Sequence, residues 1–96
     1  MKPPAIRDYP KSLKVGDETY AIKFVRKFKD SETVGECDPE SRTIFLKLGE
    51  GREETFKTLI HELMHALLEF EGDLDVKHRF IYKAESLIYQ FLCDNF

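Results

Sequence analysis

The chain has 96 residues and a formal net charge of −3, with acidic and basic residues spread along its length. This length suits a single domain over residues 1–96 with one modest hydrophobic core, and it leaves no room for a second catalytic domain. Nucleic-acid binding calls for a basic stripe. The short basic stretch 23–29 alternates with apolar residues, as the solvated face of a strand does. We therefore expect no nucleic-acid partner.

Two further classes are excluded by the pattern of apolar residues and cysteines. No run approaches the roughly 20 apolar residues that cross a bilayer, and the N-terminus lacks the apolar segment of a secretory signal. Cys37 and Cys93 stand far apart with no CxxC pair, which favours free thiols. We expect a cytoplasmic protein without membrane contact, whose proline-rich residues 1–11 form an arm with little regular structure.

Three strands are predicted in the first half of the chain. Gly16-Asp17 separates two alternating segments, 13–15 and 19–25, and this arrangement is typical of a hairpin. A polar stretch follows over residues 29–36. A tight turn is expected over 38–41, and a third strand follows over 43–48.

Two helices are predicted in the second half. Apolar residues at helical spacing predict a first helix over 56–70, entered through 49–51. Gly72 suits its C-terminal end. Asp73 or Asp75 suits the N-cap of a second helix that runs to about Cys93. The residues expected to form its core face are Phe80, Ala84, Leu87, Ile88 and Phe91. The order predicts an α+β fold, a small three-stranded antiparallel sheet with both helices on one face.

The first helix carries the pattern H-E-x-x-H at His61, Glu62 and His65. Side chains four residues apart lie on the same face of a helix, so both imidazoles can reach one metal ion. Glu62 lies beside them, close enough to accept a proton from a water on that metal. This pattern is typical of zinc metallopeptidases, in which zinc acidifies the attacking water and the glutamate acts as general base.

A catalytic zinc ion usually has three protein ligands and one open position, so a third ligand is expected after His65. Glu69 lies on the same straight helix and cannot approach from another direction. Glu71 has the spacing of another zinc family, but that family needs a glycine where this chain has Leu68. Cys37 is a minor option without a paired cysteine. Asp73 and Asp75 suit helix caps.

His78 and Glu85 therefore remain as candidates for the third ligand. His78, Tyr82, Glu85 and Tyr89 share one face of the second helix. Such a face is ordinarily the polar edge of an amphipathic helix. A carboxylate beside a core face is costly unless something binds it. Opposite a helix with two histidines, we favour Glu85 as the third ligand and keep His78 as its rival.

In these residues the chain resembles the gluzincin group of zincin metallopeptidases, in which H-E-x-x-H is followed by a glutamate on the next helix. The matching residues are His61, Glu62 and His65, with Glu85 twenty residues after His65. The size and order of the elements are similar to those of the small stand-alone minigluzincins of prokaryotes and phages. The resemblance covers roughly residues 35–95, and only the H-E-x-x-H part is highly specific.

The resemblance implies one zinc ion and a peptide or protein substrate. Thr43, Phe45 and Lys47 would belong to the sheet edge along which an extended peptide binds. Tyr82 or His78 would polarise the scissile carbonyl. Larger gluzincins form the other cleft wall with an extra domain, which this chain lacks. Some minigluzincins resemble latent enzymes in which a terminal segment blocks the cleft, and here the N-terminal arm is the segment expected to do so.

Three functions follow from these residues. The first is a zinc-dependent metallopeptidase in which Glu62 is the general base, then the general acid. The second is a latent or non-catalytic zinc module that binds a peptide or a regulatory partner. The third is a small α+β domain that holds no metal.

Overall fold

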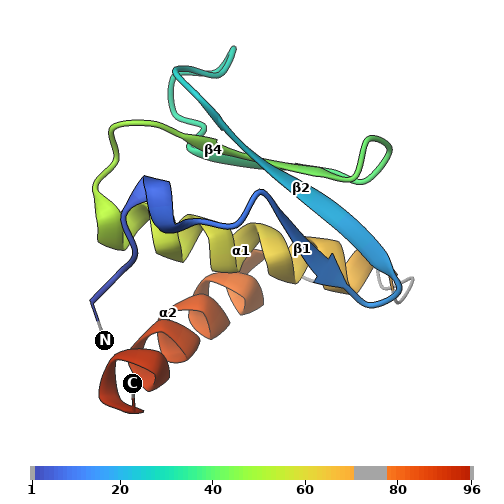
Figure 1. Ribbon diagram of the computed structural model, residues 1–96. Helices are drawn as coiled ribbons and strands as arrows, with labels where there is room; N and C mark the ends of the chain where they lie inside the picture. Colours follow the sequence, from blue (N-terminus) through green and yellow to red (C-terminus); the bar gives the residue numbers. More distant parts are fainter. Residues whose placement is uncertain (1, 71–77, 96) are drawn as a thin grey trace.

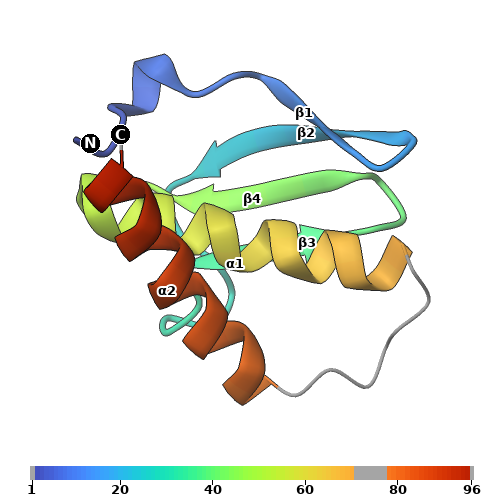
Figure 2. The same ribbon diagram turned by 90° about the horizontal axis from the view of Figure 1, so that it is seen from below.

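The computed structural model describes residues 2–70 and 78–95, except for the side chains of 68–70, 78–80, 91 and 94. A sheet lies over helix α1, and helix α2 crosses beneath α1 (Figure 1 and Figure 2). The elements are the 3-10 turn η1 (Ile6–Asp8), the strands β1 (Ser12–Val15), β2 (Glu18–Val25), β3 (Gly35–Asp38) and β4 (Thr43–Lys47), and the helices α1 (Arg52–Phe70) and α2 (His78–Asn95). The expected α+β class is confirmed. Within the described residues, no helix combines the length and apolar character of a transmembrane span.

The sheet differs from the three antiparallel strands predicted from the sequence. Its four described strands lie in the order β1-β2-β4-β3, and β2 pairs with β4 in parallel. The hairpin between β1 and β2 is confirmed, and Gly16 in its turn has φ 62°, which glycine adopts without strain. The unpredicted strand, β3, pairs antiparallel with β4. Because β3 lies outside β4, β4 is a central strand and β3 forms the edge.

The hydrophobic core lies between the sheet and α1. In the parallel register Ile22 pairs with Ile44, and both Ile44 and Leu46 are completely buried. They pack with Leu59 and Ala66 of α1. Burying an aliphatic side chain of this size contributes about 1.5–3 kcal/mol. This packing holds α1 against the sheet and fixes where its polar flank lies.

Helix α1 begins four residues before the predicted segment 56–70. Gly51 has φ 82°, and its carbonyl accepts the N–H of Thr55 at 3.0 Å. Glu53 and Glu54 stand in the first turn, where the helix dipole favours negative charge.

Helix α2 packs against α1 rather than lying beside it on the sheet. It buries Ile81 and Tyr89, whereas Leu87 and Ile88 are 71% and 40% exposed. The predicted core face was therefore wrong at Leu87 and Ile88. Ala84 is half-buried, and the side chains of Phe80 and Phe91 lie outside the described part of the structure. Apolar residues occur on more than one side of this helix, and the side that meets α1 is the one that carries Glu85.

The edge strand β3 lies close to α1 at Gly35. A methyl group placed on Gly35 would overlap Thr58 Cγ2 and would come within 3.2 Å of Glu62 Oε2. Glycine is therefore required here by proximity, because any side chain would push the strand away from the helix.

Replacing Gly35 by alanine is expected to destabilise the fold by about 1–3 kcal/mol through overpacking, which lowers the Tm by about 5–15 °C. Thr58→Ser removes the overlapping methyl and keeps the hydroxyl that donates to the Glu54 carbonyl at 2.8 Å. Thermal denaturation of both single variants and the double variant checks this. The double variant should recover at least half of the lost stability; additive losses would show that the contact is not the cause.

Candidate functional site

A cleft of about 580 Å³ opens between α1, α2 and the edge strand β3. Its walls combine the H-E-x-x-H residues of α1, two residues of α2 and the segment that leads into β3. The residues that line it include Glu32, Gly35, Glu36, Cys37, Glu54, Lys57, Thr58, His61, Glu62, His65, Tyr82 and Glu85.

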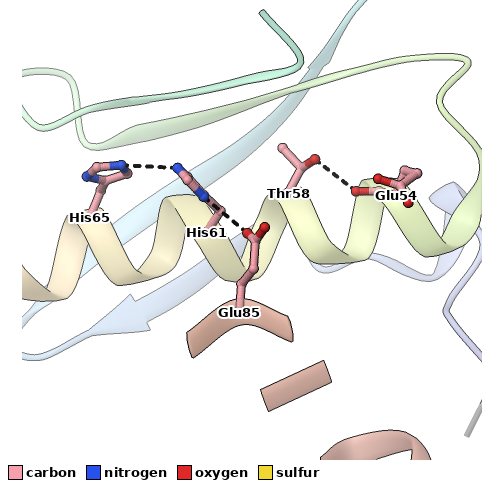
Figure 3. A network of polar contacts seen from close by, with 5 residues as sticks. All are labelled: Glu54, Thr58, His61, His65 and Glu85. Carbon is pink, nitrogen blue, oxygen red and sulfur yellow. Dashed lines mark hydrogen bonds and ion pairs between the residues drawn. The ribbon is translucent and has the colours of Figure 1, made fainter. Parts of the chain in front are cut away.

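The two histidines of the motif meet as their spacing predicts. Their rings project from the same side of α1 (Figure 3), and His61 Nε2 lies 3.2 Å from His65 Nε2. Two nitrogens bound tetrahedrally to one zinc at about 2.0–2.1 Å would stand about 3.4 Å apart. His61 is only 9% exposed, so the pair is held by its surroundings. The spacing therefore fits two imidazole ligands on one metal ion.

Glu85 reaches across from α2 to the other nitrogen of His61. Its Oε2 lies 3.1 Å from His61 Nδ1. A carboxylate accepts, so His61 Nδ1–H donates to Glu85, and this tautomer leaves the Nε2 lone pair directed at His65. Histidine ligands of metals commonly donate their second N–H to a carboxylate in this way.

The positions of the two imidazoles thus suit two ligands of one metal ion, whereas Glu85 is not in a ligand position. Among the described residues, no group of three or more His, Cys, Asp or Glu side chains surrounds a single point suited to a metal. Glu85 contacts Nδ1, whereas the two nitrogens that face each other are Nε2 atoms. The predicted third ligand is therefore adjacent to the histidine pair and bonded to one of them.

Burial raises the pKa of the Glu85 carboxyl, Lys57 lowers it, and the nearby Glu54 carboxylate raises it further. The Glu85 side chain is only 14% exposed. At neutral pH the ionised form therefore carries a desolvation cost that a bound cation would offset.

Glu85→Gln is expected to raise the Tm of the metal-free protein at neutral pH. Folding raises the pKa of this carboxyl above its unfolded value of 4.5. Its contribution to the stability of the folded protein is therefore lost as the pH rises above 4.5. The neutral amide avoids this loss and still accepts from His61 Nδ1. The gain should therefore shrink as pH falls below about 4.5. Thermal denaturation of chelated protein across pH checks it; a Glu85→Gln variant that melts lower than the parent at neutral pH contradicts it.

Glu62 lies in the wall of the cleft next to the edge strand. It is 8% exposed, and its Oε2 faces the backbone at Gly35. One residue along a helix turns the side chain by about 100°, so Glu62 points towards β3 while His61 and His65 share their own side. The carboxylate and the imidazole pair thus line one space.

Tyr82 of α2 lies beside His61. Its ring centroid lies 4.9 Å from that of His61, and the residue is 56% exposed. The side chain of His78, at the first residue of α2, lies outside the described part, as does the side chain of Glu69. The candidates Glu71, Asp73 and Asp75, and the predicted helix end at Gly72, also lie outside the described residues.

The prediction that the strand from Thr43 forms the sheet edge beside the cleft was wrong. Thr43, Phe45 and Lys47 belong to the central strand β4 and do not line the cleft. The edge that faces the cleft is β3, through Gly35 and its neighbours. The predicted turn before Thr43 could have indicated β3, because a tight turn that leads into a strand implies a partner strand on its other side, here one that ends at Asp38.

The N-terminal arm lies away from the cleft. Ala5 is buried, Tyr9 packs edge-on against Phe24 with ring centroids 5.3 Å apart, and the arm meets the start of α1 at Arg52. None of the described arm residues, 2–11, lines the cleft. The expectation that the arm plugs the cleft is therefore wrong for these residues.

Cys37 and Cys93 are not joined in a disulfide, as predicted, and Cys37 lines the cleft from β3. Comparisons of the chain with protein-family models, curated proteins and solved structures found no match.

Proposed function

We propose that the protein is a zinc-dependent metallopeptidase of minimal, gluzincin-like type. The observation that carries the proposal is the 3.2 Å separation of His61 Nε2 and His65 Nε2 in the wall of a cleft that Glu62 also lines. Two imidazoles at ligand spacing, with a buried carboxylate beside them, form a donor set suited to zinc and to general-base chemistry.

His61 and His65 would hold the metal through Nε2, with Glu85 as the third protein ligand. When bound, zinc supplies a Lewis acid that acidifies the attacking water and polarises the scissile carbonyl. To serve as a ligand, Glu85 must give up its contact with His61 Nδ1. Glu85→Ala should therefore lower zinc affinity by more than the 10- to 100-fold expected for a partner of a ligand. A smaller loss would assign Glu85 the orienting role that its contact with Nδ1 already suits.

The remaining steps belong to the chain itself. Glu62 takes a proton from the attacking water and passes it to the leaving amine. An extended peptide pairs with the free edge of β3 at Gly35, which brings its backbone alongside Glu62. Tyr82, beside His61, donates its phenolic hydrogen to the carbonyl oxygen as charge develops there. His78 is the alternative donor that the resemblance implies.

The cytoplasm is the compartment that we propose. Two cysteines that form no disulfide, Cys37 and Cys93, suit a reducing environment.

Hydrolysis of a peptide mixture or of denatured casein by untagged protein tests the proposal. Cleavage should disappear when a chelator removes the metal and return when one equivalent of zinc is restored. Zinc binding without any cleavage would instead make the chain a non-catalytic zinc module. Cleavage that survives complete metal removal would overturn zinc chemistry.

A further inference from the structure

A second pocket, of about 300 Å³, lies where the N-terminal arm meets the start of α1 (Figure 1). It shares no lining residue with the cleft, so the proposed peptide chemistry does not use it. Pro4, Ala5 and Ile6 of the arm give it an apolar wall, and the loop that leads into α1 lines it through Gly49 and Gly51. Its volume stands at the lower end of the range for small-molecule sites.

Two arginines line this pocket from different elements. Arg7 belongs to η1 and Arg52 is the first residue of α1. Both are exposed, and neither makes an ion pair within the part of the chain that the structure describes. No described acidic residue lines the pocket, because Glu50 and Glu53, which flank Arg52, each lie 3.9 Å from a lysine nitrogen outside it. The pocket is therefore positively charged in a chain of net negative charge.

The start of α1 belongs to the wall of this pocket and has no side-chain cap. The first N–H groups of a helix lack partners within it and carry partial positive charge. Gly51, the residue before the helix, has no side chain that could accept from them. A methyl group placed on Gly51 would meet no atom within 4 Å. This end of the helix is thus open to an acceptor from outside the chain.

A buried hydroxyl in the same wall lacks a hydrogen-bond partner. Thr55 is only 5% exposed, and its hydroxyl makes no hydrogen bond with any described residue. It stands one turn before Leu59 on the stripe of α1 that packs against the sheet, where an apolar residue would serve packing alone. The buried Tyr9 hydroxyl also lacks a partner among the described residues, and burial raises the pKa of Tyr9 to about 12, which keeps it a donor. Both hydroxyls carry a desolvation cost that an acceptor in the pocket would offset.

We infer that this pocket binds a small organic oxyanion, a carboxylate or a phosphate on an apolar body. The anionic group lies between Arg7, Arg52 and the start of α1, and it accepts a hydrogen bond from the Thr55 hydroxyl. Guanidinium groups match both oxyanions because they can donate two parallel hydrogen bonds. The apolar body packs against the wall formed by residues 4–6. This site is independent of zinc and of the proposed peptidase activity.

Titration of four probes into the untagged protein, followed by amide chemical shifts in NMR spectra, tests the inference. The probes are phenyl phosphate, benzoate, inorganic phosphate and benzyl alcohol. Phenyl phosphate or benzoate should shift the amide signals of Gly51 and Arg52. The better of the two should bind at least about tenfold more tightly than inorganic phosphate, which lacks the apolar body, and than benzyl alcohol, which lacks the charge. A chelator should leave these shifts unchanged, since the pocket shares no residue with the metal site.

Four variants connect the binding to the named groups. R7Q/R52Q should weaken it at least about tenfold, and Thr55→Val, which removes the hydroxyl at nearly constant volume, about fivefold. Thr55→Ser keeps the hydroxyl and should bind as the parent does. Arg42→Gln makes the same charge change at an exposed arginine outside the pocket and should also leave the affinity unchanged.

Two results would overturn the inference. The first is the absence of shifts at Gly51 and Arg52 with both organic oxyanions at about 10 mM, a concentration that detects even weak binding. The second is an affinity that R7Q/R52Q leaves at the parent value. Cleavage assays do not enter either result, so a failure of the peptidase proposal would leave this site standing.

Discussion

Replacing Glu62 by glutamine is expected to lower kcat for peptide hydrolysis by about 10²- to 10⁴-fold while zinc stays bound. A general base of this kind contributes about 10²–10⁴-fold, and the amide cannot accept the proton. Glu62 is 8% exposed and lines the cleft beside Gly35, so the near-isosteric glutamine should fit the same space. Steady-state kinetics and elemental analysis of the same preparation measure both quantities.

The matched control for this substitution is Glu40→Gln. Glu40 is an exposed residue of the turn between β3 and β4, and it does not line the cleft. It should retain the parent kcat, KM and zinc content. Hydrolysis that persists in Glu62→Gln at the parent rate would remove Glu62 from the mechanism. Loss of zinc from that variant would assign it to the metal site instead.

Removing zinc is expected to lower the thermal stability of the protein substantially, and His65→Ala should abolish that dependence. A ligand that binds only the folded state at 100 times its Kd stabilises it by about 2.7 kcal/mol. For a domain of this size the corresponding shift is about 10–20 °C in Tm. The shift should also weaken as pH falls below about 6, because protonated imidazoles cannot bind a metal.

The variant His78→Ala, measured in the same experiment, distinguishes His78 from Glu85 as the third zinc ligand. If Glu85 is the third ligand, His78→Ala keeps the zinc-dependent rise in Tm and His65→Ala loses it. If His78→Ala also loses the rise, then His78 belongs to the metal site and the ligand set must be revised. A parent protein whose Tm is the same with and without zinc would contradict the metal site as a whole.

The local features of the fold were predictable from the sequence. Gly16 between alternating segments predicted the first hairpin, and the spacing of His61 and His65 predicted that both rings would share one side of a helix. Both predictions depend only on turn preference and on helical periodicity, which act over a few residues.

The pairings between distant segments were not predictable in the same way. The parallel pairing of β2 with β4 joins Ile22 to Ile44, and nothing local in either strand specifies it. The short strand β3 begins at Gly35 in a polar stretch, so neither hydrophobicity nor β-propensity indicates it. The packing of β3 against α1 depends on the close approach of Gly35 to Thr58, two residues that are far apart in the sequence.

The face of α2 shows the same limit at the site itself. Leu87 and Ile88 have the apolar character of core residues, yet the helix exposes them and buries Ile81 and Tyr89. The buried side brings Glu85 next to His61, although Leu87 and Ile88, which were predicted to face the core, are exposed. The side of such a helix that faces inward depends on the helix against which it packs. The sequence of α2 alone therefore does not specify its buried face.

Zinc content is the measurement that tests the central claim most directly. Untagged protein, incubated with zinc and freed of unbound metal, is analysed for metal per chain. The arrangement of His61, His65 and Glu85 predicts about one zinc per chain, falling to background in His65→Ala. Less than about 0.1 zinc per chain in the parent protein would contradict both the metal site and the peptidase chemistry that depends on it.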